Sequence, residues 1–135
     1  MRAMRDQARA AAVREGPPVL ACDVDPRAVD LARENARSAG VEIVCQRQDV
    51  RELTPLEPPG FVVSNPPYGE RLAADAALYD DLARALRGMV GHTVALLAGT
   101  PAIPEAMRRA LRREPDRWWM LYNGPIECRL LVYAL

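Results

Sequence analysis

The sequence lacks several residue types in the amounts that particular classes of protein need. It contains no lysine: all 18 basic residues are arginine, and 18 acidic residues bring the formal net charge to zero. A chain that binds nucleic acid through most of its surface carries an excess of basic residues, so any contact with RNA or DNA has to be local. A GC-rich genome explains the use of arginine for lysine more simply than phosphate recognition does.

Cysteine, histidine and long apolar runs are also scarce. The three cysteines, Cys22, Cys45 and Cys128, lie far apart with only His92 to complement them, which argues against a zinc site or a disulfide framework. No apolar run approaches the roughly 20 residues that span a bilayer, and the amino terminus lacks the apolar stretch of a signal peptide. We therefore expect a cytoplasmic protein with reduced core cysteines and no metal, in which His92 simply precedes a strand.

What the sequence does contain is an alternation of strand-like and helix-like segments. Its 135 residues predict a single domain over 1–135, with residues 1–16 as a helical lead-in. Short apolar runs predict strands at residues 19–22, 41–45, 61–63 and 93–98. Helical periodicity predicts helices at residues 1–14, 26–39, 75–89 and 104–113.

Turn and cap residues support this division. Asp25 is a suitable N-cap, Pro26 suits the first helical position, and Gly40 ends the same helix. Asn123-Gly124 between two apolar runs is a strong signal for a β-hairpin. Strands that alternate with helices and end in a hairpin predict an α/β fold, with a mostly parallel sheet and one reversed strand.

The segment Asn65-Pro66-Pro67-Tyr68 directly follows the apolar run at 61–63 and is the most informative motif. Each proline fixes its own φ and restricts the residue before it, so the oxygens of this turn have set directions. The Asn65 side-chain carbonyl and the Pro66 backbone carbonyl can accept both hydrogens of one planar amine, and Tyr68 offers a face for stacking. The motif therefore predicts a site for an exocyclic amine.

A purely conformational explanation exists for the same residues. Asn and Pro dominate turns because of their backbone preferences alone. The strand in front of the motif favours a functional site, because open α/β sheets bind ligands at the carboxyl ends of their strands.

Two acidic residues occupy comparable places. Asp23 ends one predicted strand, and Asp49 lies just beyond the next. An acid at such a strand end accepts hydrogen bonds from ribose hydroxyls in nucleotide-binding α/β proteins, although Asp is also common there as a cap or Asx turn. Together with Asn65, three polar groups at three strand ends would converge on one crevice.

Four segments carry a resemblance to a known family: VLACDVDP (residues 19–26), QDV (48–50), SNPPYGERL (64–72) and YNGPIECRLLVY (122–133). They resemble class I S-adenosylmethionine-dependent methyltransferases. Within that class they resemble the THUMP-bearing guanine-N2 methyltransferases of large-subunit ribosomal RNA. The likeness runs from about residue 19 to residue 135, and the last two segments are its specific part.

The resemblance implies a Rossmann-like catalytic domain and a role for each site residue. Asp23 would hold the cofactor ribose and Asp49 the adenine amine. Asn65, which borders the cofactor, and Pro66 would accept the target amine, and Tyr68 would stack on the target base. The reaction would be an in-line transfer of the sulfonium methyl group to nitrogen.

The residues around the motif are implied to contact the substrate. These are Pro67, Gly69 and Arg71, while for Glu70 the resemblance implies a local structural or substrate role. For Glu70 and Arg71, helix capping and a solvated side chain are equally good explanations.

The resemblance also marks what the 135 residues lack. The family's first strand and the glycine-rich turn around the methionine end of the cofactor have no counterpart between residues 1 and 19, and a THUMP module is absent. That strand normally lies between those ending at Asp23 and Asn65. These two strands must therefore pair directly, recruit another segment or leave unpaired edges. We expect weak cofactor binding and self-association of this chain alone.

Alternatives remain open at this stage. The same motif suits the N6 amine of adenine or a glutamine side-chain amide, although the residues after the motif and the carboxyl-terminal segment favour RNA. A non-catalytic or partner-dependent fragment with the methyltransferase fold would also account for the missing glycine-rich turn.

Overall fold

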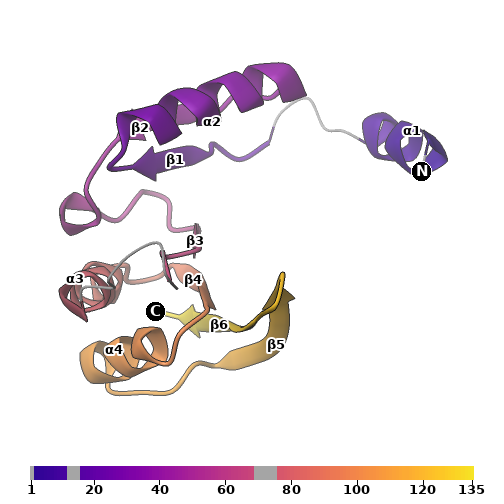
Figure 1. Ribbon diagram of the computed structural model, residues 1–135. Helices are drawn as coiled ribbons and strands as arrows, with labels where there is room; N and C mark the ends of the chain where they lie inside the picture. The colour runs from indigo at the N-terminus through magenta and orange to yellow at the C-terminus, as the bar shows by residue number, and fades with distance from the viewer. Residues whose placement is uncertain (1, 12–15, 69–75) are drawn as a thin grey trace. The chain divides into compact units, whose positions relative to one another are not determined.

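A computed structural model describes residues 2–11, 16–68 and 76–135 (Figure 1). The chain forms two compact units, residues 1–47 and residues 48–135. Each unit combines helices with parallel strand pairing, so the predicted α/β class is confirmed. The single domain over 1–135 stays a prediction.

The first unit is built on one parallel strand pair. Its elements are α1 (Arg2–Ala10), β1 (Leu20–Asp23), α2 (Pro26–Ala39) and β2 (Val44–Arg47). In the parallel pair, Leu20 lies opposite Val44. Strand β2 begins three residues later than the predicted strand, because the chain is still completing the end of α2: the Val41 N–H donates to the Ala36 carbonyl at 3.1 Å.

Helix α2 has the ends that its sequence predicts. The Asp25 carboxylate accepts a hydrogen bond from the Arg27 N–H at 2.9 Å, and Pro26 occupies the first turn. Gly40 lies in the left-handed region with φ of 70°, which costs glycine little because it has no Cβ. The Gly40 N–H donates to the last carbonyls of the helix, which would otherwise lack partners.

The second unit carries a four-stranded sheet in the order β3-β4-β6-β5. Its elements are the 3-10 helix η1 (Val50–Glu52), β3 (Phe61–Ser64), α3 (Ala76–Arg87), β4 (Thr93–Ala98), α4 (Ala102–Leu111), β5 (Arg117–Asn123) and β6 (Ile126–Ala134). Strands β3 and β4 are parallel, and β6 runs antiparallel to both β4 and β5. The predicted single reversed strand is therefore β6.

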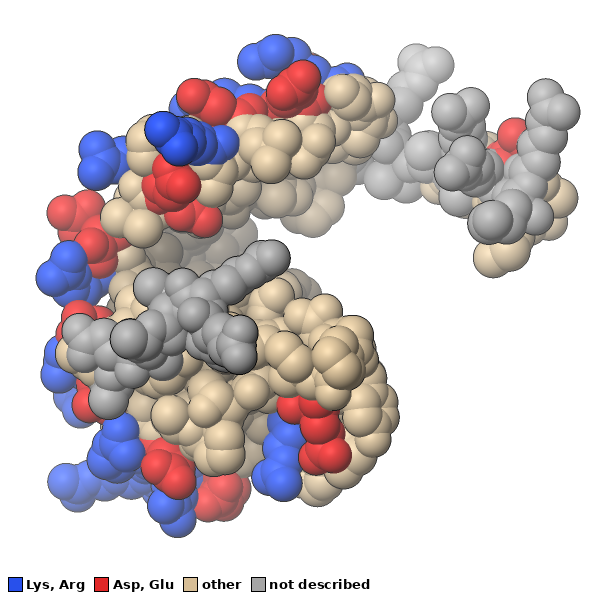
Figure 2. All heavy atoms as spheres, viewed as in Figure 1, with Lys and Arg blue, Asp and Glu red and all other residues tan. Residues whose placement is uncertain are grey.

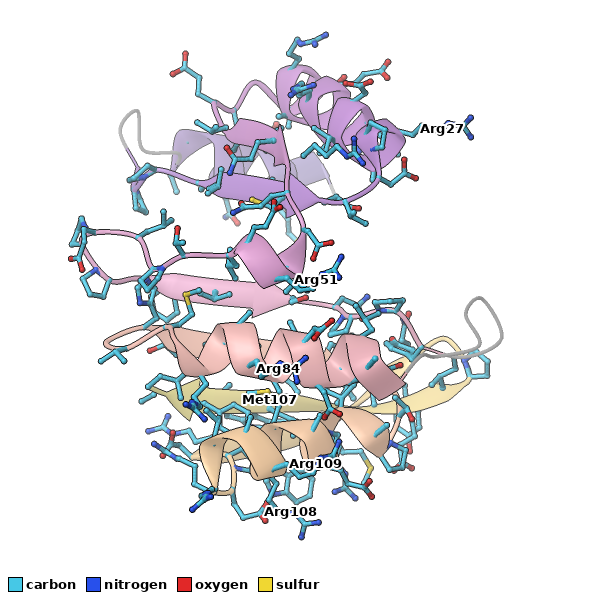
Figure 3. The ribbon with its side chains drawn as sticks, turned by 90° about the vertical axis from the view of Figure 1, so that its left-hand side faces the viewer. Arg27, Arg51, Arg84, Met107, Arg108 and Arg109 are labelled. Atoms are coloured by element: carbon cyan, nitrogen blue, oxygen red, sulfur yellow. The ribbon has the colours of Figure 1, made fainter. Side chains whose placement is uncertain are left out.

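The hydrophobic core of this unit lies between the sheet and two helices. Figures 1 and 3 show α3 and α4 on the same face of the sheet. The buried cluster comprises Tyr79, Leu82, Ala83, Leu86, Met89, Val94, Leu96, Ala98, Ile103, Ala106, Met107, Leu131 and Tyr133. Burial of each large side chain in such a cluster contributes about 1.5–3 kcal/mol, so this layer is the main source of stability in the unit.

The buried face of α3 differs from the stripe that helical spacing suggested. The predicted stripe included Leu78 and Ala85, which are only partly buried. Tyr79 and Ala83 lie in the core instead. The helix is thus rotated toward the side that brings the Tyr79 hydroxyl to the loop after β3.

The predicted positions of the cysteines and of His92 are confirmed except for one cysteine. Cys45 and Cys128 are buried free thiols, but Cys22 is exposed, so the prediction of a core position was wrong for Cys22. His92 directly precedes β4 and is only 3% exposed. Within the described ranges, no group of side chains could hold a metal ion.

The β5–β6 hairpin is confirmed, but its turn lies one residue later than Asn123-Gly124 suggests. Asn123 is the last residue of β5 and pairs with Ile126, so the connecting residues are Gly124 and Pro125. Gly124 has φ of 60°, whereas proline holds φ near −65°. This pair fits a type II′ turn and excludes type I′, which needs positive φ at both positions.

Each sheet has an open edge among the described residues. Strand β1 pairs only with β2, and β3 pairs only with β4. On β3, the side chains of Phe61 and Val63 are 81% and 76% exposed. None of the helices in the described ranges has the length and apolar character needed to cross a membrane.

The open edge of β3 predicts self-association of the isolated 135-residue chain. An unpaired edge with exposed apolar side chains is a template for pairing with another chain. Val63→Lys should shift the chain toward monomer in light scattering, because a charge on the edge opposes strand pairing. Val90→Lys is the matched control, since Val90 is 74% exposed but lies in the loop before β4. A wild-type chain that stays monomeric and unfolds cooperatively at high concentration would contradict the prediction.

Candidate active site

The Asn-Pro-Pro-Tyr motif leaves the sheet at the carboxyl end of β3. Ser64, the last residue of β3, lies opposite Leu96 of the parallel strand β4. The motif therefore emerges beside the end of β4, where Gly99 follows directly. This is the edge of a parallel sheet at which α/β proteins bind their ligands.

The first anchor of the motif is the backbone of Pro67. The Tyr79 hydroxyl of α3 donates a hydrogen bond to the Pro67 carbonyl at 2.7 Å. Tyr79 is almost fully buried, and burial raises the pKa of its hydroxyl, so the donor keeps its proton. A single hydrogen bond of this kind contributes about 0.5–1.5 kcal/mol net, and here it fixes the loop against the core helix.

The second anchor is the aromatic ring of Tyr68, which lies over Gly99. A Cβ added at Gly99 would overlap three consecutive ring atoms of Tyr68, at nearly equal distances from all three. Because the three distances are so similar, the added Cβ would lie over the face of the Tyr68 ring and not at its rim. Only glycine leaves room for the ring, and a substrate base would have to stack on the opposite face.

The third anchor is the Tyr68 hydroxyl group, which contacts the β5–β6 hairpin. The side-chain amide of Asn123 donates a hydrogen bond to the Tyr68 oxygen at 2.7 Å, and the Cys128 sulfur lies 3.5 Å from it. The pKa of Tyr68 is raised, chiefly by Cys128 and further by burial, while the Asn123 donor opposes the shift. Tyr68 therefore remains a neutral phenol at physiological pH.

The two residues before these anchors differ in exposure. Pro66 is buried, whereas Asn65 is exposed at the end of the strand. Within the described part of the chain, the Asn65 side chain makes no hydrogen bond, so its carbonyl oxygen remains available as an acceptor. A fixed loop thus presents a free acceptor at the carboxyl edge of the sheet.

Asp49 has a structural role that its position alone did not reveal. Its carboxylate caps η1 by accepting from the Arg51 N–H at 2.9 Å, and it also accepts from the Arg51 guanidinium at 2.9 and 2.6 Å. These hydrogen bonds hold the pKa of Asp49 well below its usual range. Arg51 is labelled in Figure 3, where it comes from η1 beside α3.

Asp23 is the last residue of β1, in the first compact unit. One of its carboxylate oxygens accepts a hydrogen bond from the Asp25 N–H at 2.8 Å, which is the geometry of an Asx turn. Asp23 is exposed, and its second oxygen has no described partner. Gly69, Glu70 and Arg71, which the sequence also indicated, lie outside the described residues.

The charged surface has no concentrated basic patch on the face shown in Figure 2, where arginines and acidic residues are interspersed. Many of these charges are paired. The pairs are Arg33–Asp30, Arg51–Asp49, Arg84–Asp81, Arg109–Asp80 and Arg113–Asp116. This distribution agrees with the zero net charge of the sequence.

Comparison with known families gives a match over residues 1–131 to the model described as "RMKL-like, methyltransferase domain". The chain belongs to this family. The match begins at residue 1, so it extends the resemblance over the segment before residue 19 that the motifs alone did not include.

Two curated relatives of the RMKL-like domain are named ribosomal RNA large subunit methyltransferase K/L. The one from Aeromonas salmonicida is 36% identical and covers 87% of this chain, and the one from Methylococcus capsulatus is 38% identical and covers 97%. The chain spans 19% and 18% of the lengths of these two proteins.

A solved structure supports the fold of the RMKL-like domain. SMU.472, described as a methyltransferase complexed with SAH, is 25% identical with a TM-score of 0.81. The match covers 98% of this chain and 36% of that one. The Rossmann-like methyltransferase fold predicted from the sequence is confirmed.

Sequence reasoning missed four contacts that fix the motif. Gly99 and Cys128 had no assigned role at the site, Tyr79 was left out of the helix stripe, and Asn123 was assigned to the turn. The only available signal was YNGPIECRLLVY (residues 122–133), in which Asn123 and Cys128 occur together. The pattern indicated a hairpin without indicating what the hairpin touches.

Gly99→Ala should displace the Tyr68 ring. The added methyl group would overlap the ring, so we expect a loss of about 1–3 kcal/mol in urea unfolding of the protein expressed from its full reading frame. Gly60→Ala is the control, because a Cβ at Gly60 meets nothing within 4 Å. In a Tyr68→Ala background the cost of Gly99→Ala should vanish; an unchanged cost would mean that the ring does not lie over Gly99.

Proposed function

We propose that this chain is part of an S-adenosylmethionine-dependent methyltransferase that modifies an exocyclic amine in RNA, with guanine N2 of ribosomal RNA as the target. The observation that carries the proposal is the exposed Asn65 acceptor on a loop fixed by Tyr79, Gly99 and Asn123. Membership of a methyltransferase family supports the reaction class.

The motif residues would act on the target amine by position. Asn65 and the Pro66 carbonyl would accept its two hydrogens and so turn the nitrogen lone pair toward the incoming methyl group. The amine is a weak nucleophile because this lone pair is conjugated with the ring. Preorganised acceptors stabilise the positive charge that develops on nitrogen, without reorganisation during the reaction.

The cofactor would be held at its nucleoside end by the two strand-end acids. Asp23 fits the ribose, because it is exposed and one of its oxygens has no described partner. Asp49 would accept the adenine amine on its remaining lone pair or in exchange for an Arg51 contact, and Arg51 is sufficiently exposed to move. When bound, S-adenosylmethionine supplies the electrophilic methyl group.

The RNA target is supported by the names of the two curated relatives, both ribosomal RNA methyltransferases. Guanine N2 is favoured by the residues after the motif and by the segment at 122–133. Affinity for RNA would come from a module such as THUMP outside these 135 residues, since their charge is balanced. Pro67, Gly69 and Arg71 are proposed to contact the substrate locally. With ribosomal RNA as its substrate, the protein would act in the cytoplasm.

Asn65→Ala should abolish methyl transfer while leaving folding almost unchanged. Loss of one preorganised polar group costs a factor of about a hundred to a thousand in kcat, and the exposed side chain makes no described contact with the core. Transfer of labelled methyl groups to RNA substrates measures the effect, with thermal unfolding as the control for folding. Parallel assays on adenine-N6 and glutamine substrates distinguish the target class. A near-normal rate for Asn65→Ala would remove Asn65 from the mechanism.

Residues 1–135 alone should bind S-adenosylmethionine weakly or not at all. Asp23 and Asp49 can hold only the nucleoside end, and residues 1–19 contain no glycine-rich turn for the methionine end. Isothermal calorimetry on this segment and on the product of the full reading frame measures the difference. Micromolar binding by the segment would contradict the expectation and assign the missing contacts to its first 16 residues.

A further inference from the structure

We propose that Asn123 is a positioning residue for methyl transfer, acting through the hydroxyl group of Tyr68. The inference rests on the proposed function, in which the motif at the end of β3 receives the target base. Asn123 comes from the opposite edge of the sheet, because β3 and β5 are the two outer strands in the order β3-β4-β6-β5.

The turn of the hairpin leaves Asn123 free for this role. Gly124 and Pro125 make the turn, so Asn123 is an ordinary strand residue opposite Ile126. Residues two apart in a strand point to the same side. Asn123 pairs with Ile126, and Cys128 follows two residues later, so both side chains face the side on which the Tyr68 oxygen lies.

Together these contacts determine the plane of the Tyr68 ring. Gly99 supports one face of the ring, and Asn123 holds its oxygen at 2.7 Å. A tyrosine side chain has two rotatable bonds before its ring, and one face contact and one fixed oxygen are enough to restrict both. A base stacked on the other face would take its orientation from this plane, and so would the direction of its amine.

A purely structural role explains the contact less well. Asn123 is exposed, and the seven paired residues of β5 hold the hairpin to β6 without help from this side chain. The hydrogen bond joins residues 55 positions apart in sequence, the last residue of β5 and a residue of the loop after β3. Its loss should therefore affect the orientation of Tyr68 more than the stability of the fold.

The test uses the protein expressed from its full reading frame. Asn123→Ala should lower kcat about three- to tenfold, the typical net value of one hydrogen bond. The KM for S-adenosylmethionine should stay within about twofold, because the contact touches only the base-binding side. Asn123→Asp should retain most of the rate, since the Tyr68 hydroxyl can donate to the carboxylate instead. Equal losses in Asn123→Ala and Asn123→Asp would overturn the proposal.

A double-mutant cycle identifies the group through which Asn123 acts. Tyr68→Phe removes only the hydroxyl, so it should cause the same loss as Asn123→Ala, and the double variant should lose no more than either single variant. Glu127→Gln is the matched control, because Glu127 is exposed on the same hairpin and points to the opposite side from Asn123. Additive losses would overturn the proposal by showing that Asn123 acts elsewhere.

A measurement without turnover separates this inference from the proposed function. The Cζ resonance of Tyr68, assigned with the Tyr68→Phe variant, should shift in Asn123→Ala and stay in place in Glu127→Gln. If Asn65→Ala abolishes transfer while Asn123→Ala retains full kcat, the positioning role is wrong and the proposed function stands. If the wild-type protein transfers no methyl group to RNA, the proposed function is wrong, and the positioning role falls with it even where the Tyr68 resonance shifts.

Discussion

The contact between the Tyr68 ring and Gly99 is the constraint on which the site depends. The ring can approach the end of β4 only because residue 99 has no side chain. From that position the Tyr68 oxygen reaches Asn123, and the neighbouring Pro67 carbonyl meets Tyr79 of the core helix. The loop is therefore a part of the packed sheet and helix layer, and its exposed acceptor takes its position from the core.

Much of the fold could be predicted from local signals. The ends of α2 follow from Asp25, Pro26 and Gly40, because caps and stops depend on a few neighbouring residues. Strand β4 has the bounds that its apolar run indicated, and the reversed strand follows from the hairpin signal. These features succeed because the energy that decides them comes from residues close together in sequence.

The site was less predictable because tertiary contacts decide it. The motif was found from the stiffness of its prolines, but the sequence pattern did not indicate that Tyr68 meets residues 31 and 60 positions further along the chain. Asp49 was recognised as an acid at a strand end, where a ligand-binding role and a capping role both fit the sequence. The structure shows that Asp49 caps η1 and contacts Arg51. A rotation of α3 likewise exchanged Leu78 for Tyr79 in the core.

The two-residue turn at Gly124 and Pro125 has a consequence for how this region can change during evolution. Most surface loops accept insertions freely, but here the number of residues in the turn sets which side of β5 each side chain faces. One extra or one missing residue would reverse that alternation and turn Asn123 away from Tyr68. Changes in the length of the hairpin tip are therefore restricted by an aromatic ring on the loop after β3.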